Sequence, residues 1–203
     1  MALKSLDKLI ECFKIFPSVG SKTAYRYAMK ILEMDDSRVQ FFVETVLKAK
    51  KNIKKCHCCG NYSENEICEI CENSHRDQQS ICVVANPNDI ISIEKLGIYQ
   101  GLYHVLGGTI SPISHQLVED LNIEKLLERA KVGIQEIILA LPQTIEGETT
   151  AFYLSKILPK EIKITQLASG LAMGTQLEYA DELTLIKAIN QRHLFREESP
   201  YKL

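Results

Sequence analysis

The chain has 203 residues, of which 45% are hydrophobic and 25% charged, and its formal net charge is −2. This composition excludes a disordered chain and is typical of one large folded domain or two to three small ones. The longest apolar runs, such as residues 134–141, are too short to cross a bilayer, and residues 1–7 carry no export signal. We therefore expect a cytoplasmic protein without a membrane partner.

Residues 1–54 combine helical patterns with many lysines. Apolar residues at helical spacing predict helices over residues 4–16 and 22–34, with Ser21 as the cap of the second. A third helix follows Asp36, and its apolar residues are expected to face inward: Val39, Phe42, Val43, Val46 and Leu47. A net charge near zero is not typical of a nucleic-acid binder, but the lysines predict a basic N-terminal module on a neutral or acidic body.

The hairpin that joins the first two helices contains a candidate phosphate-binding site. Backbone N–H groups at the start of the second helix can hold a phosphate, and Gly20 permits its close approach. Lys22 and Arg26 lie four residues apart on one helical face, so both can reach the same DNA backbone. The pattern predicts DNA binding without sequence specificity through Gly20, Lys22 and Arg26. An ordinary helix turn with solvated basic residues is the equally weighted alternative.

Five of the seven cysteines lie between Cys56 and Cys71, an arrangement unlike that of a disulfide scaffold. Cys56 and Cys59 form one C-x2-C pair, and Cys68 and Cys71 form a second. Two such turns supply the four thiolates of a tetrahedral zinc site. We therefore predict a small zinc knuckle over residues 55–76 that holds one structural Zn²⁺ and has no open position for catalysis. Three neighbours are expected to take no part in it: His57, Cys58 and His75.

From residue 80 to residue 172, short β-branched runs alternate with helical segments. The strand-like runs lie at residues 81–85, 102–106, 136–141 and 162–166. Strands that alternate with helices predict a parallel, Rossmann-like sheet covered by helices. Residues 173–203 are expected to form a helical C-terminal tail. The predicted fold class is therefore multidomain α/β, with a helical N-terminal module and a zinc knuckle before the sheet.

These segments, in this order, resemble the RecR family of bacterial recombination mediators. Residues 16–24 look like the family's helix–hairpin–helix, and the four-cysteine knuckle follows at the family's spacing. Residues 81–90 look like the first strand and turn of the family's Toprim domain. Further family segments are similar to residues 107–112, 144–148 and 177–185.

The resemblance implies a role in recombinational DNA repair. It implies binding of single- and double-stranded DNA by a ring-like homotetramer, and partnership with RecO, and in many bacteria RecF, to place RecA on single-strand gaps. The lysine and arginine with which the family contacts DNA correspond to Lys22 and Arg26. The implied domains are a helix–hairpin–helix module (1–54), a four-cysteine zinc finger (55–76), a Toprim domain (80–172) and a Walker-B-like C-terminal segment with an oligomerisation tail (173–203).

Some positions depart from the family pattern. Ser18 stands where the hairpin usually has glycine, and Ala85 stands where the Toprim strand usually ends in glutamate. The other departures precede or lie within the C-terminal segment: Gln166, Ala172 and Thr175.

Active Toprim enzymes hold Mg²⁺ with clustered carboxylates while they break or join DNA strands. Ala85 removes the first carboxylate, so we predict a non-catalytic DNA-binding mediator. Asp89, Glu146 and Glu148 remain, and they are candidates for binding a basic partner; solvated loop carboxylates or a loosely held Mg²⁺ are the alternatives. A Mg²⁺-dependent Toprim nuclease or strand-transfer enzyme is the alternative function, and a zinc-ribbon protein–protein adaptor is a third.

Overall fold

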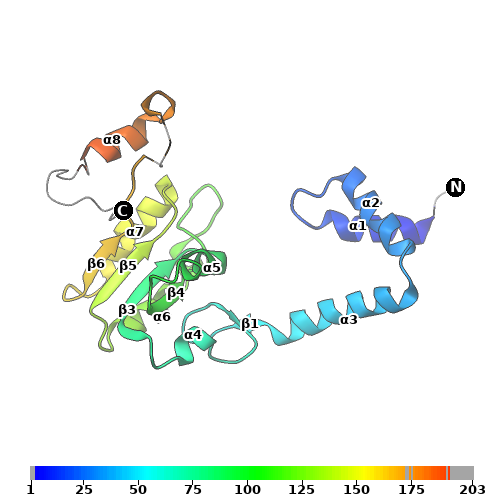
Figure 1. Cartoon of the computed structure of the whole chain (residues 1–203), viewed down its shortest axis with the longest axis horizontal. Coiled ribbons are helices and arrows are strands. Elements are labelled where there is room, and N and C mark those ends of the chain that lie inside the picture. Colours follow the sequence, from blue (N-terminus) through cyan, green and yellow to red (C-terminus); the bar gives the residue numbers. More distant parts are fainter. Residues whose placement is uncertain (1–2, 172–173, 175, 191, 193–203) are drawn as a thin grey trace. The chain divides into compact units, whose positions relative to one another are not determined.

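The computed structural model describes residues 3–171, 174, 176–190 and 192. The chain divides into two compact units, one ending at residue 53 and the other beginning at residue 54 (Figure 1). The departures at Ala172 and Thr175, and most of the tail after residue 190, lie outside the described residues. No described helix is long and apolar enough to span a membrane.

The first unit consists, in its described part, of the helices α1 (Lys4–Lys14), α2 (Ser21–Leu32) and α3 (Asp36–Asn52). Helices α1 and α2 pack against each other. Ala24 and Ala28 lie four residues apart on one face of α2 and have no exposed surface, so their small side chains let α1 approach closely. The Phe13 ring meets the Tyr27 ring edge-on, with 5.6 Å between centroids. This contact fixes the helix–hairpin–helix around two alanines and an aromatic pair.

Two expectations for this unit were wrong. Ser21 is the first residue of α2, and the cap position belongs to Gly20, whose backbone is extended. Helix α3 has no buried residue: Phe42 is 47% exposed and Leu47 64%. Val43 and Val46 are likewise exposed, and Val39 is half-buried. An apolar stripe shows which face of a helix avoids water, but it does not show whether the same chain covers that face.

The second unit is centred on a parallel sheet in the order β4-β3-β5-β6. Its strands are β3 (Asp77–Val84), β4 (Gly101–Val105), β5 (Glu136–Ala140) and β6 (Lys163–Gln166). The crossovers carry α5 (Pro87–Glu94), α6 (Ile123–Ala130) with the 3-10 turn η1 (Val118–Asp120) before it, and α7 (Ile145–Ile157). This arrangement confirms the predicted Rossmann-like sheet.

Both faces of the sheet are buried, as expected of parallel strands. Because side chains alternate along a strand, Ile81 and Val83 of β3 join an apolar cluster with α6 and α7, to which Leu126 and Leu154 contribute. On the opposite face Cys82, Val84, Tyr103 and Val105 pack with Ile90 of α5. The rigid sheet therefore brings the ends of its strands to fixed positions at one edge.

Short elements flank the sheet at both ends of the second unit. The strands β1 (Lys54–Lys55) and β2 (Tyr62–Ser63) and the helix α4 (Glu69–Glu72) precede it. The turn η2 (Leu177–Tyr179) and α8 (Glu182–Asn190) follow it. Lys187 of α8 donates to the Glu148 carboxylate of α7 at 2.8 Å, which joins the C-terminal helix to the sheet's helical layer. The domain boundaries remain predictions.

The hairpin between α1 and α2 contains one strained residue, Ser18, whose φ is +64°. A side chain in this left-handed region costs about 1–2 kcal/mol. Replacing Ser18 with Gly is expected to raise the free energy of unfolding by about 0.5–1 kcal/mol, because the relief exceeds the extra backbone entropy that glycine loses. Urea denaturation followed by helical circular dichroism measures this change.

Ser21→Gly is the matched control, since it makes the same change where φ is not positive. It is expected to leave the stability unchanged or lower it. A lower stability for Ser18→Gly than for the parent would contradict the strain at this position.

Candidate zinc centre and nucleic-acid interface

The loop between β1 and β2 turns tightly and directs two thiols to one side. The two strands pair in antiparallel register, with Lys55 opposite Tyr62. Within the loop, the Cys56 N–H donates to the Asn61 carbonyl at 2.7 Å and the Gly60 N–H donates to the Cys56 carbonyl at 3.0 Å. These bonds close the turn that carries Cys56 and Cys59.

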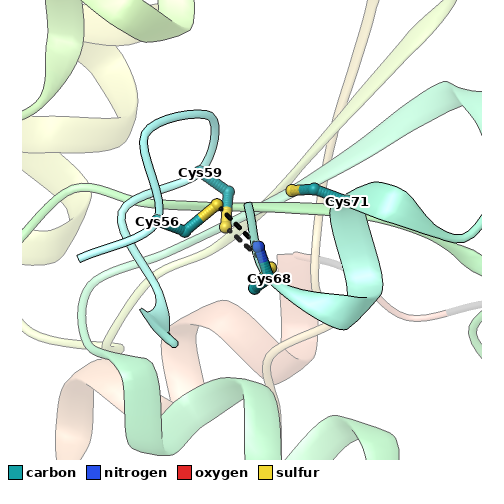
Figure 2. A group of neighbouring side chains, drawn as sticks. All are labelled: Cys56, Cys59, Cys68 and Cys71. Atoms are coloured by element: carbon teal, nitrogen blue, oxygen red, sulfur yellow. Dashed lines mark hydrogen bonds between the residues drawn. The ribbon is translucent and has the colours of Figure 1, made fainter. Parts of the chain in front are cut away.

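The other two cysteines lie at the start of α4. Cys68 occupies the cap position of this helix and Cys71 lies within it. All four sulfurs lie within 4.8 Å of one another (Figure 2), and Cys59 Sγ is 3.6 Å from Cys68 Sγ. Zinc–sulfur bonds of about 2.3 Å place the sulfurs of a tetrahedron about 3.8 Å apart. The donor set and its spacing therefore fit one Zn²⁺.

Backbone N–H groups also point at the sulfurs. The Cys68 N–H donates to Cys56 Sγ at 3.3 Å, and the Asn61 N–H donates to Cys59 Sγ at 3.5 Å. Such bonds stabilise the negative charge that four thiolates bring together. They therefore favour the thiolate form in which cysteine binds a metal.

The thiols shift each other's protonation strongly. A hydrogen bond between Cys59 and Cys68 lowers the pKa of the Cys68 thiol and raises the pKa of the Cys59 thiol. Without a metal, the pair therefore shares a proton between two close sulfurs. A bound Zn²⁺ supplies the positive charge that lets all four cysteines be thiolates, so zinc binding releases protons.

Three neighbouring residues are not members of this group of four, although Cys58 packs against it. Cys58 is half-buried and His57 and His75 are exposed, and none of the three belongs to the set of four ligands. Across the described ranges, the cysteine cluster is also the only group of three or more Cys, His, Asp or Glu side chains close enough to hold a metal ion.

Contacts that the sequence did not reveal attach the knuckle to the sheet. The Val105 N–H, at the end of β4, donates to the Cys59 carbonyl at 2.7 Å. Asn122 Nδ2 donates to the Val105 carbonyl at 3.2 Å, and Lys125 Nζ donates to the His57 carbonyl at 3.1 Å. These partners are far apart in the chain and belong to no local motif, so only the folded arrangement identifies them.

Gly60 makes this attachment sterically feasible. Its φ is +79°, and a Cβ at this position would lie 3.1 Å from the Val105 carbonyl oxygen. Glycine is the residue that tolerates both the left-handed backbone and the close approach. The zinc knuckle can therefore lie directly against the end of β4.

A buried histidine, His104, supports the attachment of the knuckle to the end of β4. His104 has no exposed surface; its Nε2–H donates to the Asn122 carbonyl at 2.7 Å, and its Nδ1 accepts from Arg129 at 3.2 Å. Burial lowers the pKa of His104 to about 4, so the ring is neutral and serves as a structural linker. It orients Asn122, which in turn holds the end of β4.

The three residues of the predicted DNA site lie at the start of α2. Gly20 is the cap residue, and no atom outside its immediate neighbours comes within 4 Å of where its Cβ would be. Lys22 and Arg26 are exposed on the helix surface. Within the described part of the chain, neither makes an ion pair. Their role in DNA binding stays a prediction.

The candidate carboxylates differ in their surroundings. Asp89 closes the capping box of α5 by accepting from the Asn86 N–H at 2.8 Å. Glu148 accepts from Lys187 at 2.8 Å and from Gln166 at 3.2 Å. Glu146 is half-buried in the first turn of α7. Two of the three carboxylates are thus engaged in contacts within the protein, which the sequence did not predict.

Four family models match the chain in the order of its elements. They are the RecR helix-hairpin-helix (residues 6–50), the RecR zinc finger domain of the four-cysteine type (53–73), the Toprim domain (79–168) and the RecR C-terminal model (170–193). Together with the fold and the cysteine cluster, they define a zinc-finger protein of DNA recombination.

Relatives place the chain within one family. It is 44% identical to the Recombination protein RecR of two strains of Clostridium perfringens, over 189 residues that cover 93% of this chain and 96% of each relative. The chain belongs to the RecR family.

Replacing Cys68 with Ser is expected to give a zinc-poor protein with a partly unfolded knuckle, because residues 54–76 have few buried apolar side chains and depend on the metal for their fold. Zinc per chain, measured by mass spectrometry of the metal, and the thermal melt report this loss. Cys58→Ser is the matched control within the same loop and is expected to keep one zinc. Normal zinc content in Cys68→Ser would refute the four-cysteine site.

Proposed function

We propose that this protein is a non-catalytic DNA-binding mediator that acts with RecO to help RecA load onto single-strand gaps. In this role it binds single- and double-stranded DNA as a homo-oligomer. The observation that carries the proposal is the pair of cations, Lys22 and Arg26, exposed beside the hairpin of a RecR helix–hairpin–helix. Cations four residues apart on a helix can contact adjacent phosphates of one strand.

The strand ends of the Toprim domain support a non-catalytic role. Ala85, directly after β3, is 1% exposed and belongs to the apolar cluster that includes Leu106 and Leu141. A buried methyl group thus stands where the resemblance places a glutamate. Asp89, Glu146 and Glu148, all within the described residues, do not form a group that could hold a metal ion, and a hard divalent cation needs several converging oxygens.

The same surfaces support the proposed partners. Glu146 is the candidate for contact with a basic surface of RecO, whereas Asp89 and Glu148 would have to exchange their present contacts. RecF is a further proposed partner. The exposed apolar side of α3 supports self-association, and it includes a cavity of about 410 Å³ lined by Met34, Ser37, Arg38, Phe41, Phe42 and Thr45.

The double variant Lys22→Ala, Arg26→Ala is expected to weaken DNA binding equally for all sequences. Loss of two phosphate contacts lowers the slope of log affinity against log salt by about 2 per DNA-bound protomer. Fluorescence anisotropy over a series of salt concentrations measures it. Lys160→Ala, an exposed lysine of the second unit, is the control. An unchanged slope in the double variant would remove these residues from the DNA interface.

Gapped DNA incubated with the protein and Mg²⁺ is expected to shift in a native gel while its strands stay intact in a denaturing gel. The physical reason is that the described carboxylates at the strand ends do not converge on one point. Cut or rejoined strands, reduced by Glu146→Gln, would instead favour the Mg²⁺-dependent Toprim enzyme.

A further inference from the structure

The second unit contains a cavity of about 490 Å³ between the zinc knuckle and the ends of β3 and β4. Its lining comes from Lys55, His57 and Tyr62 of the knuckle and from Asn86, Gly107 and Lys125 beside the sheet. A volume in this range is typical of a site for a small ligand or a single monomer of a polymer. None of the functions proposed above uses it.

Two lysines line the cavity. Lys125 Nζ donates one hydrogen bond, to the His57 carbonyl, so two of its three N–H donors remain free. Lys55 is exposed and forms no ion pair among the residues that the structure describes. The one carboxylate in the lining is Asp120, and it already accepts from the Leu117 N–H at 2.9 Å. The anion-binding groups of this cavity are therefore its two ammonium groups, while Asp120 and the zinc-site thiolate of Cys56 contribute negative charge to the same lining.

An aromatic ring lies next to these charges. Tyr62 is the direct cross-strand partner of Lys55, and 60% of its surface is exposed although it belongs to a strand. Cross-strand partners have Cβ atoms about 4.5–5.5 Å apart and leave the same face of the strand pair, so the ring and the lysine side chain start from neighbouring positions. An exposed aromatic face beside a cation is the combination that binds an unpaired base and its phosphate.

The backbone amides around the cavity are already used. The Asn86 N–H donates to Asp89, the Gly107 N–H to the Ala85 carbonyl, and Pro87 has none to offer. Lysine side chains would thus carry the electrostatic contact, which makes it independent of base sequence and sensitive to salt.

We propose that this cavity binds one nucleotide of single-stranded DNA, with the phosphate on Lys55 and Lys125 and the base stacked on Tyr62. The proposal rests on the DNA-binding function proposed above and adds a second contact in the other unit of the chain. Duplex DNA offers phosphates but no unpaired base, so the site distinguishes single strands from duplexes. An acidic protein segment would satisfy the lysines but would leave the aromatic face without a partner.

The test compares affinities of the full-length protein for single-stranded and duplex DNA. Lys55→Gln with Lys125→Gln is expected to lower single-strand affinity and to reduce its salt slope by about 1.4, that is about 0.7 for each lost contact. Tyr62→Ala is expected to weaken single-strand binding about 5- to 150-fold, as loss of a stacked base does. Tyr62→Phe, which keeps the ring, is expected to bind single strands with the parent's affinity. Duplex affinity stays at the parent level in both Tyr62 variants, and in the lysine variant it falls by less than single-strand affinity does.

Several controls keep the outcome unambiguous. Zinc content at the parent level shows that the knuckle is intact, and Lys160→Gln controls for loss of an exposed lysine elsewhere. Photo-crosslinking of iododeoxyuridine-labelled single strands is expected to label the peptide that contains Tyr62. The proposal is overturned if single-strand affinity is unchanged in the lysine double variant and in Tyr62→Ala, and if no crosslink forms to the peptide that contains Tyr62. Loss of oligoglutamate binding in the lysine variant, with DNA binding unchanged, also overturns it and assigns the cavity to an acidic protein segment.

Failure of this site is distinguishable from failure of the proposed function. If Lys22→Ala with Arg26→Ala lowers binding to both kinds of DNA while the cavity variants behave like the parent, only the second site is wrong. If Lys22→Ala with Arg26→Ala behaves like the parent and the cavity variants lose single-strand binding, the assignment of DNA binding to the hairpin is wrong. The assignment of single-strand binding to the cavity is then supported.

Discussion

Four thiols within 4.8 Å of one another are the constraint on which the second unit's N-terminal part depends. Residues 54–76 bury few apolar side chains beyond the cysteines themselves, so the metal replaces a hydrophobic core there. Once the metal holds the turn that contains Cys59, the Cys59 carbonyl can accept from the Val105 N–H at the end of β4. This hydrogen bond attaches the knuckle to the edge of the sheet. Val105 and Lys125, which make that attachment, also line the cavity that contains Lys55 and Tyr62.

The described part of this Toprim fold holds no cluster of metal-binding carboxylates. Both faces of the sheet are filled by apolar side chains, and the position after β3 belongs to that core. Of the remaining carboxylates, Asp89 stabilises its own helix start, and Glu148 joins α7 to α8. Charges that could have converged on a cation are instead used to hold helices in place.

Cationic groups, by contrast, are left exposed in both units. The chain's net charge is −2, yet Lys22 and Arg26 in one unit and Lys55 in the other have no acidic partner among the described residues. The net charge is summed over the whole surface of the molecule, whereas a ligand contacts only one part of that surface. Local positive surfaces can therefore serve DNA binding on a chain that is slightly acidic overall.

The sequence by itself determined the elements whose signals are local. Hydrophobic periodicity predicted α1, α2 and the alternation of β3 to β6 with helices, and cysteine spacing predicted the four-ligand set, because period and ligand spacing depend on residues close in the chain. It did not determine that the apolar side of α3 stays exposed within this chain, nor that Glu148 is engaged. The placement of Lys125 beside His57, 68 residues earlier, was likewise decided by tertiary structure alone. The physical reason is that the contacts of Glu148 and Lys125 arise from packing between distant segments, and these residues carry no signal until the chain has folded. The capping box of Asn86 and Asp89 is different, because its residues lie three apart and its signal is local.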